Sequence, residues 1–108
     1  MLAMPVPVEN EEAPLAASLG VRELSRRIVA GDEQAFRCFH DLFAPRVFGL
    51  SMVLTQGCEA LARDLVQTVM IRAARKFRRF EHEDQLWAWL STIARHAWVD
   101  HVRSEESR

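Results

Sequence analysis

The strongest structural signal in this chain lies at residues 58–77, which read CEALARDLVQTVMIRAARKF. At about 100° per residue, the apolar side chains of this stretch gather on one side of a helix. The stripe that we expect to be buried consists of Ala62, Leu65, Val66, Val69, Met70, Ala73 and Phe77. The opposite side is polar and mostly basic. The pattern therefore predicts an amphipathic helix that packs against other elements of a folded domain.

Ile71 is the apolar residue in the middle of that polar side, with Asp64, Gln67, Arg72 and Arg75 around it. An apolar side chain framed by charged and amide groups is typical of a small protein-binding hot spot. A solvated helix face with one isolated exposed Ile is the alternative.

Shorter helical patterns precede this stretch. The apolar spacing over residues 21–30 predicts a short helix, which Gly31 ends. Asp32 can cap a second helix, and Pro45 suits the first turn of a third one that stops at Gly57. An aromatic ridge on the second helix, which we expect to be core, consists of Phe36, Phe39 and Phe43.

A last helix is predicted from Asp84 to Arg103, with an apolar line at Leu86, Leu90, Ile93, Ala94 and Ala97. No segment shows the alternation of a strand. We therefore expect an all-α fold, a compact bundle of four to five helices.

The 108 residues fit one domain. Residues 1–20 contain three prolines and three acids but no Lys or Arg, which predicts a flexible acidic leader. The helical domain is then expected at 21–103, and residues 104–108 resemble the start of a linker.

Several classes of protein are disfavoured. No apolar run approaches the roughly 20 residues of a membrane helix and no secretory signal is present, so we expect a cytoplasmic protein that does not bind a membrane. Cys38 and Cys58 lack metal-ligand spacing, and we expect no metal or cofactor. His96 and His101 are five residues apart, on different sides of a helix, and no nucleophile or phosphate-loop motif occurs, so we expect no catalysis.

Charge is segregated along the chain, although the formal net charge is only −1. Residues 63–80 hold six basic side chains against one acid, Asp64. Such a density indicates either a polyanion or an acidic protein surface as partner, or else a solvated helix face.

Four segments together resemble region 2 of the extracytoplasmic-function (ECF) sigma factors, the promoter-specificity subunits of bacterial RNA polymerase. They are AGDEQAF at 30–36, FAPRVFGL at 43–50, RDLVQTVMIRAARKFRRF at 63–80 and WAWLSTIARHAWVDHVR at 87–103. The resemblance covers residues 21–103 in order, spacing and residue type. This chain has Thr68, Ala74 and His96 where the family more often has an acid, an aromatic residue and Asn.

The resemblance implies two binding surfaces. The first would dock on the clamp helices of the polymerase β′ subunit through Asp64, Gln67, Ile71, Arg72 and Arg75. The second would recognise and melt the minus-ten promoter element, with a base of the non-template strand flipped into a pocket whose wall Phe80 could supply. Its residues would be Lys76, Arg78, Arg79, Phe80, Glu81, His82, Arg95, His96 and Arg103.

The resemblance also implies an anti-sigma factor as a partner. Full family members continue into a second helical domain, so we expect the chain to be an excised N-terminal domain, with a naturally short protein as the alternative. A second functional hypothesis is a sigma-like helical module that binds only protein. It would bind its partner without preferring single-stranded promoter DNA.

Overall fold

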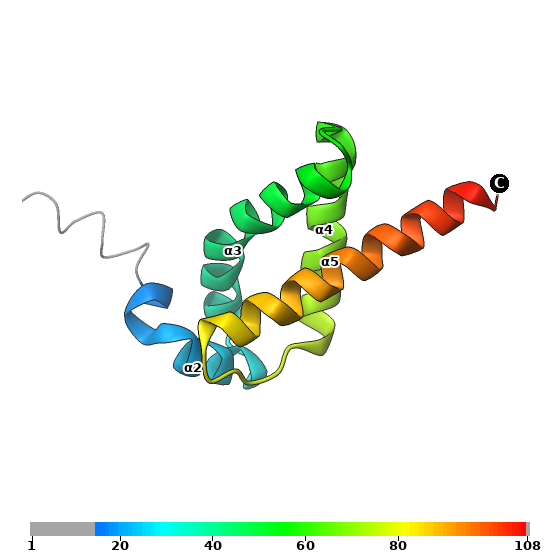
Figure 1. Cartoon of the computed structure of the whole chain (residues 1–108). Coiled ribbons are helices and arrows are strands. Elements are labelled where there is room, and N and C mark those ends of the chain that lie inside the picture. Colours follow the sequence, from blue (N-terminus) through cyan, green and yellow to red (C-terminus); the bar gives the residue numbers. More distant parts are fainter. Residues whose placement is uncertain (1–14, 108) are drawn as a thin grey trace, which may run out of the picture.

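The computed structural model describes residues 15–107, which form four helices and no strand (Figure 1). They are α2 (Leu15–Val29), α3 (Glu33–Leu54), α4 (Glu59–Lys76) and α5 (Glu83–Glu106). Each helix packs on the next one in the sequence, and α5 also contacts α3 and α2. The all-α bundle predicted from the sequence is confirmed. The leader predicted at 1–20 lies mostly outside the described residues.

The first predicted helix forms the second half of α2. Gly20, at φ 75° and ψ 168°, interrupts the helical backbone and separates this half from the residues before it. The helix ends where Gly31 adopts φ 94° and donates to the Ile28 carbonyl, while the Asp32 N–H donates to the Arg27 carbonyl. This pair of bonds is a Schellman motif, which requires a residue in the left-handed region and so favours glycine.

The structure corrects the prediction of separate second and third helices, because α3 runs without a break through Pro45. Asp32 caps it as expected, its Oδ1 accepting from the N–H groups of Gln34 and Ala35 at 3.0 and 3.1 Å. Residues every four positions are buried along the whole helix: Ala35, Phe39, Phe43, Val47 and Ser51. Pro45 is exposed. The helix α3 bends along its length (Figure 1). The continuous buried stripe offsets the hydrogen bond that proline cannot donate.

The centre of the bundle is aromatic. The Phe77 ring lies 4.9 Å from that of Phe39 and 5.2 Å from that of Trp89, both in edge-on geometry. The buried side of α4 consists of Ala62, Leu65, Val69, Met70 and Ala73, as its periodicity predicts. Within residues 15–107, no helix combines the length and apolar character needed to cross a membrane.

Candidate functional site

The exposed side of α4 carries Ile71, whose side chain is 52% exposed. Asp64, Gln67 and Arg75 are also exposed and lie on the same side, because they are spaced by three or four residues. The structure thus confirms that Ile71 lies outside the core with polar neighbours around it. Apolar area left in water on an ordered helix is free to be buried against a partner.

Arg72 stands at the edge of this surface rather than within it. Its guanidinium makes an ion pair with Asp100 of α5, with a nitrogen–oxygen distance of 3.0 Å. This ion pair therefore links α4 to α5 at the protein surface. Arg63 pairs with Glu59 one turn earlier on α4, whereas Arg75 and Lys76 make no ion pair with any residue in the range 15–107.

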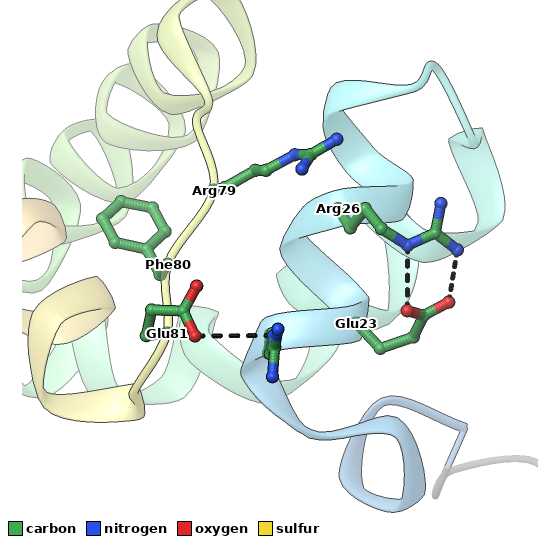
Figure 2. Close-up of a pocket in the computed structure, with 6 residues that line it drawn as sticks. Glu23, Arg26, Arg79, Phe80 and Glu81 are labelled. Carbon is green, nitrogen blue, oxygen red and sulfur yellow. Dashed lines mark hydrogen bonds and ion pairs between the residues drawn. The ribbon is translucent and has the colours of Figure 1, made fainter.

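The loop between α4 and α5, residues 77–82, passes over α2 and forms a pocket with it (Figure 2). The pocket has a volume of about 440 Å³. Its lining consists of Arg22, Glu23 and Arg26 from α2 and Arg79, Phe80 and Glu81 from the loop. Three guanidinium groups and two carboxylates therefore face one small space.

Ion pairs neutralise some of these charged groups. Arg26 forms two bonds to the Glu23 carboxylate, at 2.9 and 2.5 Å, and Arg27 adds a third at 3.1 Å. Hydrogen bonds from Arg26 and then Arg27 lower the pKa of Glu23 to about 2, and the same contact raises the pKa of Arg26. Glu81 lies 3.4 Å from Arg22. Arg79 reaches toward α2 without an acidic partner in the described part of the chain (Figure 2).

Phe80 lies in the core, with only 4% of its surface exposed. Its ring contacts Phe77 and Trp89 at centroid distances of 6.0 and 5.1 Å and points away from α2 (Figure 2). We predicted that this ring forms the wall of a pocket for a flipped base, a role that requires an exposed aromatic face. In this conformation the ring stabilises the core. A ligand could reach only the neighbouring residues of the loop. A contact between Phe80 and DNA stays a prediction.

Two acids, one at the end of the loop and one at the start of α5, are paired with arginines from other helices. Arg22 of α2 pairs with Glu81, and Arg46 of α3 pairs with Glu83 at 2.8 Å. The Arg46 guanidinium also lies 4.4 Å above the Trp87 ring, which anchors the start of α5 to α3. Gln85 closes the turn by accepting from the Glu81 and His82 N–H groups. The EHED sequence therefore presents less free negative charge than its composition suggests.

Basic residues of the predicted DNA surface lie beside this loop and along α5. Lys76, Arg78 and His82 are exposed around the loop, and Arg78 lies 5.3 Å above the Phe80 ring. Arg95, His96 and Arg103 are exposed on one side of α5, and helical geometry separates the two arginines by about 12 Å along the axis. The structure thus places one group of basic residues around the loop and a second group along the C-terminal half of α5.

Four residues of this region were missed by the sequence analysis: Arg22, Ser25, Arg26 and Arg46. Three of them have partners far along the chain, 55 residues away for Ser25 and Phe80 and 37 for Arg46 and Glu83, whereas Arg26 pairs with Glu23 of its own helix. Ser25 alone had a local signal, because it is a small polar residue four positions after Val21, on the apolar side of its helix. No group of three metal-ligating side chains occurs in residues 15–107.

Comparison with known proteins shows which family the chain belongs to. The sequence profile of the family described as sigma-70 region 2 matches residues 39–108. The chain belongs to this sigma factor family. It is 33% identical over 92 residues to the ECF RNA polymerase sigma factor BldN of Streptomyces coelicolor, an alignment that covers 84% of the chain and 34% of that relative. The chain therefore spans about a third of the length of this relative, and no solved structure matches it.

Both comparisons agree with the ECF-type region 2 domain that the sequence resembles. Sigma factors are transcription initiation factors and not enzymes. The α4 side with Ile71 and the loop with its basic surroundings are accordingly the two candidate surfaces of a sigma domain.

Proposed function

We propose that this chain is the promoter-specificity domain of a sigma factor that acts with RNA polymerase in the cytoplasm. Its α4 surface would dock on the clamp helices of the β′ subunit. Ile71 is the observation that carries this proposal, since a rigid helix presents it to solvent inside a frame of Asp64, Gln67 and Arg75. Exclusion of water from an apolar centre by a polar rim is the common arrangement of a binding hot spot.

The second surface would bind the non-template strand of the minus-ten promoter element and hold the duplex open. Capture of an unstacked base needs a pocket with polar edges, and the strand needs cations along its backbone. The pocket between α2 and the loop supplies the polar edges through Arg79 and Glu81. Lys76 at the end of α4 and Arg95 and Arg103 along α5 are exposed and would hold phosphates of the strand as it leaves the pocket.

A sigma-like module that binds only protein is the second candidate, and two observations favour it. The Phe80 ring is buried, so no exposed aromatic face lines the pocket, and the loop and the first turn of α5 carry Glu81, Glu83 and Asp84. Its partner would be an anti-sigma factor or another regulator. This candidate predicts that the chain docks on protein but shows no salt-sensitive preference for the non-template strand.

Calorimetry with a purified fragment of the β′ clamp helices tests the proposal. We expect the chain to bind, and Ile71→Glu to lose binding while keeping its helicity and melting temperature, because Ile71 lies outside the core. Val53→Glu is the matched control, since Val53 is 74% exposed on α3 and outside the proposed surface. Equal losses in both variants, or no binding by a folded wild-type chain, would contradict docking through α4.

A further inference from the structure

Ser25 of α2 is the buried contact between that helix and the loop at residues 77–82. Its side chain is 1% exposed, and its Oγ accepts the Phe80 N–H at 2.9 Å. The hydroxyl lies 3.3 Å from the Phe80 carbonyl oxygen and 3.2 Å from that of Arg22, so it donates to one of these two. One hydroxyl therefore holds the loop to α2 at Phe80.

The other link between α2 and the loop is weaker. Arg22 and Glu81 are 80% and 62% exposed and lie 3.4 Å apart. Pairs of this kind are screened by salt and contribute little to stability. A hydrogen bond that satisfies a buried backbone N–H matters more, because its loss leaves that donor without a partner. Ser25 therefore determines the position of the loop more than the ion pair does.

Phe80 is held from two directions. Its ring is packed against Phe77 and Trp89, while its backbone is bonded to Ser25. The adjacent residues, Arg79 and Glu81, project into the pocket with α2 (Figure 2). A fixed backbone at Phe80 therefore fixes the Cα positions from which the side chains of Arg79 and Glu81 extend.

We propose that Ser25 is a positioning residue for the DNA-binding loop: through Phe80 it holds Arg79 and Glu81 in the geometry that takes up the single strand. The inference rests on the proposed function of this loop. It assigns a role in promoter binding to α2, a helix that contributes none of the residues expected to touch DNA.

The test compares Ser25→Ala with Ser51→Ala. Ser51 is also a fully buried serine, but its hydroxyl has no hydrogen-bond partner among the described residues, so its removal controls for deleting a buried hydroxyl. Both changes remove one oxygen and preserve the packing of the side chains around them. Amide hydrogen exchange at Phe80, binding of a labelled minus-ten oligonucleotide and binding of the β′ fragment are measured well below the melting temperature.

We expect Ser25→Ala to speed exchange at Phe80 and to weaken oligonucleotide binding about tenfold, the effect of losing one hydrogen bond to a buried group. Binding to the β′ fragment should not change, since α4 carries that surface. Ser51→Ala should match the wild type in all three measurements. Should Ser25→Ala unfold, Ser25→Cys keeps the shape with a weaker donor and acceptor and should show the same loss of oligonucleotide binding.

The outcomes are distinguishable. A wild-type chain that binds the β′ fragment but no oligonucleotide would overturn the DNA-binding proposal and this inference together. Wild-type binding that Ser25→Ala retains would overturn this inference alone. Equal losses of oligonucleotide and β′ binding would show that Ser25 only stabilises the fold, which also contradicts a positioning role.

Discussion

At the scale of single residues, Ile71 and Phe80 have opposite environments, because Ile71 is exposed on α4 and Phe80 is packed in the core. Helical periodicity assigns each side chain a direction, so the exposure of Ile71 followed from its position relative to the buried stripe. Phe80 lies in a loop, where no period applies, and the sequence resemblance suggested a pocket wall. The structure packs the ring into the core because Phe77 and Trp89 leave an aromatic site there. The hydrogen bond to Ser25 crosses 55 residues, a separation that no local pattern reveals.

Replacing Phe80 with Ala tests this placement at the level of one side chain. Deleting a buried ring removes its transfer free energy and leaves a cavity, so we expect the free energy of unfolding to fall by about 3–5 kcal/mol. Denaturant titration followed by far-UV circular dichroism measures it. Phe48→Ala is the control, since Phe48 is only half-buried and outside the core cluster. Similar small losses for both variants would show that the Phe80 ring is not a core residue.

Among the elements, α4 was predicted to within one residue at each end and α3 was not. The ends of α4 were predictable because the helical spacing of apolar residues begins after Cys58 and stops at Phe77. For α3, Pro45 is a strong local signal for a helix start, but burial every four residues continues across it. Packing of α3 on α2 and α4 outweighs the preference of Pro45 for a helix start. The sequence pattern alone does not give the strength of that packing.

Gly49 offers a test of α3 as a single helix. It lies inside the helix after Pro45, and a Cβ added there meets no atom within 4 Å. Gly49→Ala should therefore raise the free energy of unfolding by about 0.5–1 kcal/mol, measured by denaturant titration. Gly31→Ala is the contrasting variant, because Gly31 has φ 94° and a side chain there is strained. A destabilising Gly49→Ala would mean that the helix is broken near this residue.

For the whole molecule, the arrangement of charge matters more than its total. The sequence showed the excess of basic residues at 63–80, but it could not show which acids would be neutralised. In the fold, Arg22 and Arg46 pair with Glu81 and Glu83, so two arginines from distant helices reduce the free acidity of the loop. Arg79, Lys76, Arg95 and Arg103 make no ion pair within residues 15–107 and are exposed. Exposed arginine and lysine side chains therefore remain free to bind phosphates although the chain carries a net charge of −1.

The salt dependence of oligonucleotide binding measures how many of these cations meet phosphates. Each contact to a single strand contributes about 0.7 to the slope of log K against log salt concentration. We expect Arg95→Gln to reduce the slope by about that amount and to weaken binding to all sequences alike, because a phosphate contact does not read bases. Arg37→Gln removes an exposed arginine of α3 that is not among the residues expected to touch DNA, and it should leave the slope unchanged. Equal slopes for the wild type and Arg95→Gln would place the strand away from α5, and the loop pocket would then have to bind it without that helix.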